Sequence, residues 1–271
     1  MQKFENMKIL TLNYCKYLTH IPDVSHLPNL EEFSFACCDN LITIHNSIGY
    51  LNKFEVLDAE GCSKLESFPP LWLTSLKELE LRECESLKNF PELLGKMTNI
   101  ENILLCGTSI RELPFSFQNL SELRVLTLFE GGMLRFSSNF FMMPNLSKIY
   151  ARGCRLLLPK DKDILSSTVA SNVEHLVLEN NNLSDECVLA VLTLCANVKY
   201  LHLSDNTIKI LLECLNECHL LRVLRLDYCK SLEEIRGIPP NLENFSAIGC
   251  ESLTSSCRRM LLSQVCYFFL H

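Results

Sequence analysis

Short stretches of alternating apolar and polar residues recur every 21 to 27 residues along this chain, within the frame L-x-x-L-x-L-x-x-C-x-x-L-x-x-I-P. The second Leu of the frame falls at Leu10, Phe33, Leu57, Leu79, Ile103, Leu126, Ile149, Leu176, Leu201, Leu224 and Phe245. The third Leu falls at Leu12, Phe35, Ala59, Leu81, Leu105, Leu128, Ala151, Leu178, Leu203, Leu226 and Ala247. Alternation of this kind predicts a short strand with one buried face in each repeat.

A single repeat of this length cannot bury its own apolar edge, so neighbouring repeats must stack on one another. We therefore predict an α/β solenoid, a leucine-rich-repeat horseshoe whose parallel concave sheet has about eleven short strands. Because the register continues along the chain, we expect one repeat domain over residues 1–256. Residues 257–271 break the pattern and are expected to form a truncated or divergent tail.

The return segment of most repeats ends in proline, as at Ile21-Pro22, Phe68-Pro69 and Leu113-Pro114. Proline removes a backbone donor and stops a helix, so the outer side should be mostly irregular or 3-10. Repeats eight and nine are the longest and are expected to carry short helices, the first opening at Ser184-Asp185-Glu186. The charged, Ser-rich stretch 160–171 is expected to be a loop.

The fifteen cysteines first suggest disulfides or a metal site, but their spacing does not. Seven of them share the frame position three residues after the third Leu: Cys15, Cys38, Cys62, Cys84, Cys154, Cys229 and Cys250. Repeats eight and nine have Asn181 and Asn206 there. A small polar side chain at this turn can reach the backbone of the neighbouring coil. There is no C-x-x-C pair, and Cys214 and Cys218 beside His219 fit the core face of a helix better than a zinc site, so we expect no metal.

Charge and motifs argue against most other functions. A net charge of −7 and a pI near 5.6 provide no basic face for nucleic acid. No apolar run reaches the roughly 20 residues of a membrane span, and Met1–Glu5 does not open a signal peptide, so we expect a reducing compartment. The phosphate-loop, dinucleotide-binding, nucleophile-elbow and H-E-x-x-H motifs are all missing. We therefore expect neither an enzyme nor a cofactor.

If the apolar positions form the core, function must lie in the strand residues that point away from it. Eleven strands about 4.8 Å apart give an arc of roughly 50 Å, wide enough for a protein partner. Aromatic and arginine side chains, typical of binding hot spots, gather in repeats six to ten. The predicted partner-binding residues are Phe129, Tyr150, Arg152, Tyr200, His202, Arg225, Asp227 and Tyr228. An ordinary solvated face is the alternative interpretation.

Repeats three and four present an acidic patch on the same predicted face. It consists of Asp58, Glu60, Glu78, Glu80 and Glu83. We expect this patch to steer a basic partner surface toward the sheet.

Four segments carry a family resemblance: Leu18–Ser25 (LTHIPDVS), Leu113–Leu120 (LPFSFQNL), Ile235–Leu242 (IRGIPPNL) and Leu253–Cys257 (LTSSC). They resemble the repeats of plant intracellular disease-resistance proteins that join a TIR domain, a nucleotide-binding domain and leucine-rich repeats. The likeness extends to about residue 264 and is greatest to legume members of the tobacco-mosaic-virus resistance class. It implies a cytoplasmic or nucleocytoplasmic receptor whose repeats sense a pathogen effector or a guarded host protein and restrain the nucleotide-binding switch.

The chain also departs from that family. It contains neither the TIR domain nor the nucleotide-binding domain, so NAD cleavage is not carried over, and ADP or ATP would belong to a domain that this sequence lacks. The alternative function is a leucine-rich-repeat substrate adaptor of a ubiquitin ligase, which the helical repeat at Leu183–Cys187 resembles. An adaptor would need an N-terminal ligase-docking motif, and the short Pro-ended repeats fit the receptor family better.

Overall fold

The computed structural model describes residues 4–130, 133–135, 138–157, 171–211, 215–216, 218–239 and 241–268. The chain forms two compact units, Met1–Lys160 and Asp161–His271. We call them the N-terminal and the C-terminal unit and describe each by itself.

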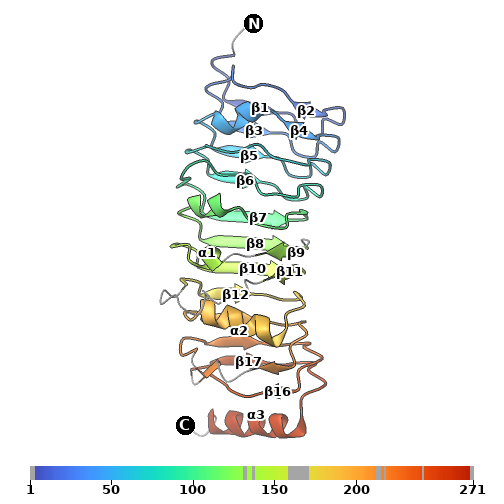
Figure 1. Cartoon of the computed structure of the whole chain (residues 1–271), viewed down its shortest axis with the longest axis vertical. Coiled ribbons are helices and arrows are strands. Elements are labelled where there is room, and N and C mark those ends of the chain that lie inside the picture. The colour runs from blue at the N-terminus through green and yellow to red at the C-terminus, as the bar shows by residue number, and fades with distance from the viewer. Residues whose placement is uncertain are drawn as a thin grey trace. The chain divides into compact units, whose positions relative to one another are not determined.

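The N-terminal unit is built from parallel strands that pair in chain order (Figure 1). One sheet contains β1 (Ile9–Thr11), β3 (Glu32–Ser34), β5 (Val56–Asp58) and β6 (Glu78–Glu80), and β7 (Asn102–Cys106), β8 (Val125–Phe129) and β10 (Lys148–Arg152) form a second ladder. The register places Phe33 opposite Leu10 and Leu57, and Leu126 opposite Ile103 and Ile149. Equivalent frame positions therefore meet across each pair of strands.

The C-terminal unit continues the same pattern with β12 (His175–Val177), β13 (Tyr200–His202), β15 (Val223–Arg225) and β17 (Asn244–Ser246). Leu201 lies opposite Leu176 and Leu224, and Leu224 lies opposite Phe245. All eleven residues predicted at the second Leu of the frame lie in strands, so the predicted parallel solenoid is confirmed.

The core consists of the periodic apolar side chains. From repeat two to repeat ten, both frame positions of every strand are buried, as Phe33, Phe35, Leu57 and Leu126 illustrate. Each buried Leu, Ile or Phe side chain among them contributes about 1.5–3 kcal/mol by leaving water. Leu10 in β1 and Leu12 just after it, and Phe245 and Ala247 in repeat eleven, are only half-buried because β1 and β17 each have a neighbouring strand on one side only.

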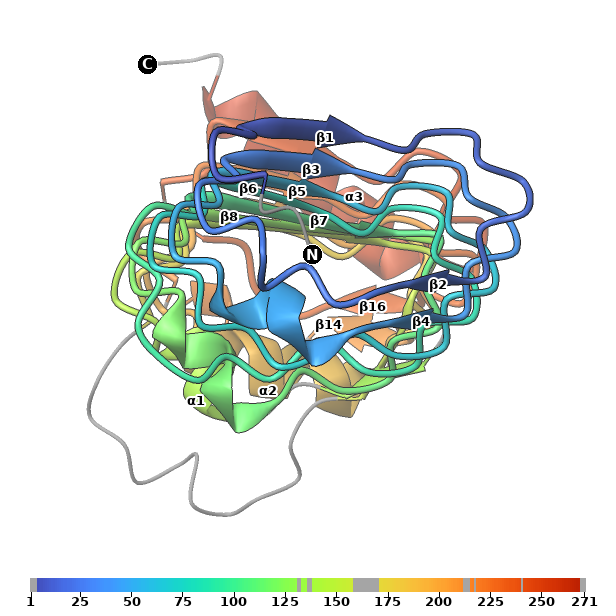
Figure 2. The same ribbon diagram turned by 90° about the horizontal axis from the view of Figure 1, so that it is seen from above.

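The outer side is mostly irregular, as predicted. Its regular pieces in the N-terminal unit are the 3-10 helices η1 (Asn46–Tyr50) and η2 (Phe115–Asn119), the one-turn helix α1 (Ser138–Phe141), and short ladders of β2 (His20–Ile21) with β4 (Thr43–Ile44) and β9 (Met133–Arg135) with β11 (Arg155–Leu157). Figure 2 shows β2 and β4 across the coil from β1 and β3. The sequence pattern did not predict these small ladders.

The outer side of the C-terminal unit carries the predicted helix of repeat eight, α2 (Asp185–Leu194). In repeat nine, β14 (Ile210–Leu211) pairs with β16 (Glu234–Ile235), and residues 215–216 form a 3-10 turn. Cys214, in the helix predicted there, lies outside the described residues, whereas Cys218 is described and is buried but lies outside any helix. The predicted loop 160–171 also lies outside the described residues, except Ser171.

A final helix, α3 (Ser255–Phe268), occupies much of the segment that we expected to be a divergent tail. The Thr254 hydroxyl accepts a hydrogen bond from the Cys257 backbone N–H at 3.3 Å, as an N-cap does. Cys257 and Leu253 are buried. The first turn of α3 is therefore attached to the last repeat.

The shared cysteine position forms a ladder of hydrogen bonds between repeats. The thiol of Cys62 donates to Phe35 O at 3.2 Å, that of Cys84 to Ala59 O at 3.2 Å, and that of Cys229 to Leu203 O at 3.2 Å. Asn206 fills the same position and bonds both to its own repeat and to repeat eight. The expected structural role of this position is confirmed.

The residue just before the ladder position is left-handed in all eleven repeats, with φ between +51° and +71°. These residues are Tyr14, Cys37, Gly61, Glu83, Gly107, Glu130, Gly153, Asn180, Asp205, Tyr228 and Gly249. The backbone N–H group of most of them bonds to the next repeat, as from Cys37 to Glu60 O at 2.7 Å. Only four are glycines, so seven side chains accept a conformation that costs roughly 1–2 kcal/mol each.

Candidate functional site

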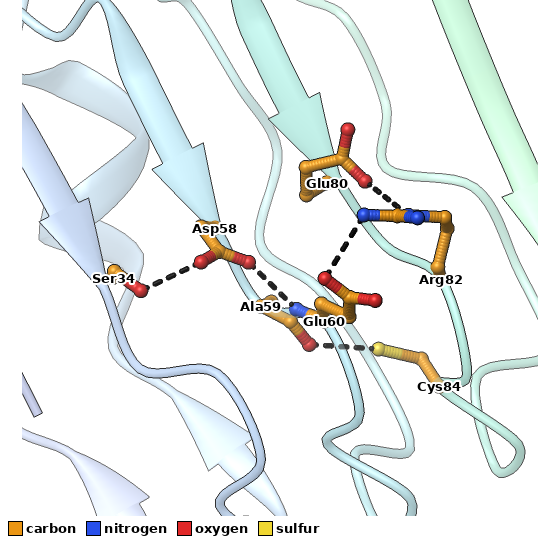
Figure 3. A network of polar contacts seen from close by, with 7 residues as sticks. All are labelled: Ser34, Asp58, Ala59, Glu60, Glu80, Arg82 and Cys84. Carbon is orange, nitrogen blue, oxygen red and sulfur yellow. Dashed lines mark hydrogen bonds and ion pairs between the residues drawn. The ribbon is translucent and has the colours of Figure 1, made fainter. Parts of the chain in front are cut away.

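Alternation within each strand turns every second side chain away from the core, and these outward residues are the candidate recognition surface. The predicted acidic patch lies on β5 and β6 and the turns after them (Figure 3). Asp58 accepts hydrogen bonds from Ser34 Oγ at 2.7 Å and from Glu60 N at 3.0 Å. Arg82 donates from Nε to Glu80 at 2.7 Å and from a terminal nitrogen to Glu60 at 3.0 Å.

The patch therefore holds five carboxylates and one guanidinium. Burial raises the pKa of the Glu80 carboxyl more than Arg82 lowers it, whereas the hydrogen bond to Glu80 raises the pKa of Arg82. Glu78 and Glu83 are exposed, and the Glu83 carboxylate lies against Gly107 in the next repeat. Asp58, Glu60 and Glu80 are thus engaged within the protein, and Glu78 and Glu83 present the exposed negative charge.

Three predicted partner-binding residues lie at the other end of the N-terminal unit. Phe129 ends β8 and is 39% exposed, and Arg152 lies opposite it at the exposed end of β10. Tyr150 is half-buried in the middle of β10, opposite Thr127. The structure therefore places an aromatic ring and an arginine next to each other on adjacent strands.

The other five predicted residues lie in the C-terminal unit. The Tyr200 ring stacks on His175, with centroids 5.8 Å apart and planes inclined by 21°, and the guanidinium carbon of Arg225 lies 6.0 Å from the Tyr200 centroid. His202 lies opposite Arg225, and its Nε2 is 2.8 Å from the Ser204 hydroxyl. Sequence reasoning missed His175, which has the same frame position as Tyr200 in the preceding repeat and was therefore detectable.

Asp227 and Tyr228 make contacts with the next repeat. Asp227 accepts hydrogen bonds from the Ser246 hydroxyl and, at 2.8 Å, from Ile248 N. Asn13 makes the same pair of hydrogen bonds to its next repeat, accepting from Ser34 Oγ at 2.5 Å and from Ala36 N at 2.8 Å. We call this pair of hydrogen bonds a bracket. The bracket identifies a structural role for Asp227.

The Tyr228 side chain is 54% exposed, and its ring lies over Gly249 of the next repeat. A β-carbon at Gly249 would lie 2.7 Å from Tyr228 Cδ1, closer than carbon atoms pack. The glycine therefore makes room for the aromatic ring.

Two further findings concern chemistry. Among the described residues, no group of three His, Cys, Asp or Glu side chains could hold a metal ion. None of the described helices is long and apolar enough to cross a membrane.

Comparison with known proteins agrees with this geometry. A family model described as "Disease resistance protein RPS4B-like, leucine-rich repeats" matches residues 72–242. Disease resistance protein RPS4B of Arabidopsis thaliana is 32% identical over 199 residues, which are 73% of this chain and 16% of the relative. TMV resistance protein N of Nicotiana glutinosa is 33% identical over 160 residues, 58% of this chain and 14% of the relative.

Solved structures agree on the fold. The leucine-rich repeat domain of the type III effector XCV3220 (XopL) matches with a TM-score of 0.58 and 20% identity, covering 88% of this chain and 76% of that one. The chain spans only about a seventh of TMV resistance protein N. From the family match and the register of its repeats, this chain belongs to the leucine-rich-repeat region of the plant TIR–nucleotide-binding disease resistance proteins, RPS4B-like in its repeats.

Proposed function

We propose that this chain is the protein-recognition module of a plant innate immune receptor, sensing a pathogen effector or a guarded host protein in the cytoplasm or nucleus. The proposal rests on how the side chains of each strand are divided between the core and the surface, in a chain of this family. The apolar side chains pack into the core, and the alternate side chains face outward, where a partner can reach them.

The outward residues support binding to a protein. Phe129 and Tyr200 offer large flat rings with few rotatable bonds, and Arg225 adds a planar cation beside Tyr200. The exposed carboxylates of Glu78 and Glu83 would attract a basic partner surface and accelerate its approach. In a full-length receptor, the same repeats would also hold the nucleotide-binding domain in its resting state until the partner arrives.

A binding screen tests recognition. The chain is screened by two-hybrid assay against secreted pathogen proteins and host proteins, and each hit is measured as a purified pair by calorimetry. Tyr150→Ala combined with Arg225→Ala should weaken binding at least about tenfold. The melting temperature should change by less than about 2 °C, because neither side chain belongs to the core.

Phe115→Ala on η2 is the matched control, since this ring is 74% exposed on the outer side. It should leave affinity unchanged. Equal affinity of the double variant and the wild type would exclude the strand face as the binding site. A large fall in melting temperature would show that these side chains belong to the core.

A further inference from the structure

Three flat side chains form a continuous stack across neighbouring strands of the C-terminal unit. His175 on β12 stacks on Tyr200 on β13, and the guanidinium carbon of Arg225 on β15 lies 6.0 Å from the centroid of the Tyr200 ring. A guanidinium carries five N–H donors in the planar fork that matches a carboxylate.

Arg225 also differs from the other arginines near the strands in its partners. Arg82 pairs with Glu80 and Glu60, and Arg222 pairs with Glu243. No carboxylate among the described residues pairs with Arg225, although its side chain is exposed. Asp227, the next outward residue on the same repeat, is already engaged by the Ser246 hydroxyl and Ile248 N.

The surroundings of the stack are partly apolar. Val177 and Val223 are half-buried outward residues of the same strands, and Ile248 is 64% exposed in the next repeat. An ion pair formed on such a surface loses water and gains strength over one formed in open solvent. The site combines one oriented cation with apolar contact area around it.

We propose that Arg225, whose guanidinium lies over the Tyr200 ring, binds the carboxylate of an aspartate or glutamate side chain on an acidic segment of the protein partner. The inference rests on the proposed function and specifies the chemistry of the partner. The carboxylate accepts two hydrogen bonds from the guanidinium edge, and an apolar neighbour in the partner covers Val223.

The test uses the full chain and two synthetic peptides, one with paired glutamates beside a leucine and one with glutamines in their place. Binding is followed by NMR at the Arg225 Nε–H group and at the Tyr200 ring. The glutamate peptide should shift both signals saturably, and the glutamine peptide should not. Arg225→Gln should abolish the effect, and Arg225→Lys should weaken binding about tenfold, because lysine lacks the planar fork.

Arg222→Gln is the matched control, because this arginine lies on the same repeat but already pairs with Glu243. It should leave peptide affinity unchanged, and the melting temperature of every variant verifies folding. Equal binding of both peptides, or full binding by Arg225→Gln, would overturn the inference. So would preference for a phosphoserine peptide over the glutamate peptide, which would assign the stack to phosphate.

The peptide result is independent of the screen. If the screen finds a partner but the glutamate peptide gives no response, the proposed recognition function stands and the inference about a carboxylate ligand is wrong. If the glutamate peptide binds specifically but the screen finds no pathogen or host partner, the inference about a carboxylate ligand stands and the proposed immune function is wrong.

Discussion

At the scale of single residues, Asn206 shows what the position after each strand does. It is 3% exposed, and its side-chain oxygen accepts hydrogen bonds from Asn181 N and Leu183 N, each at 3.0 Å. Its side-chain nitrogen donates to Leu178 O at 2.7 Å and Leu203 O at 2.8 Å. A cysteine here can replace the donor but is a poor acceptor, so Asn206 joins its repeats through more bonds than any thiol can make.

Asn206→Ala should lower the free energy of unfolding by about 2–4 kcal/mol, because two buried N–H groups and two buried carbonyls lose their partner. Urea denaturation followed by circular dichroism measures the change. Asn197→Ala, which removes a single hydrogen bond to Ser171 O, should cost clearly less. Equal effects of the two substitutions would contradict the bridging role of Asn206.

At this scale, the sequence predicted the features that are marked by a recurring residue type. It missed those that depend on backbone conformation or on the spacing of neighbouring strands. The ladder of thiols could be predicted because cysteine recurs at one frame position. The recurring left-handed conformation was indicated only by its glycines, since Tyr14, Glu83 and Tyr228 look like ordinary turn residues. The brackets at Asn13 and Asp227 depend on the exact spacing of neighbouring strands, which the residue types do not reveal.

At the scale of elements, β8 shows the two faces of one strand. Leu126 is fully buried, whereas its neighbour Thr127 points outward and is partly exposed. Alternation over two or three residues suffices to predict these faces, because adjacent side chains of a strand point in opposite directions. The small outer ladders escaped prediction because their two- and three-residue strands, such as β2 and β4, are too short to show any period.

Leu126→Asp should unfold the middle of the N-terminal unit, because it buries an unpaired charge at a cost of several kcal/mol. Thr127→Asp is the matched control, with the same change one position along the strand. It should melt within a few degrees of the wild type. Thermal denaturation of both variants checks this, and normal folding of Leu126→Asp would refute the register.

At the scale of the whole molecule, buried thiols set how stability depends on pH. Burial raises the pKa of Cys62 and Cys84 from the ordinary 9.0 to about 12, and that of Cys229 to about 11. Below pH 9 these groups are protonated in both the folded and the unfolded chain. Between pH 9 and 12 the unfolded chain releases protons that the folded chain retains, so folding stability falls as the pH rises.

The melting temperature should therefore decline steadily above pH 9. The double variant Cys62→Ser and Cys84→Ser should show a shallower decline, since a serine hydroxyl does not titrate in this range and can donate to the same carbonyls. Differential scanning calorimetry from pH 7 to pH 11 measures both slopes. Identical slopes would show that these thiols do not govern the alkaline limit.

The interlocking of each coil with only the adjacent ones also has an evolutionary consequence. The thiol and asparagine ladder, the left-handed turn and the bracket made by Asn13 and by Asp227 all join one repeat to the next, and each occurs more than once with the same geometry. Unequal crossing-over that duplicates or deletes a whole repeat would regenerate every one of these joints. A gene built this way can exchange its outward-facing side chains a whole repeat at a time while its interior stays intact.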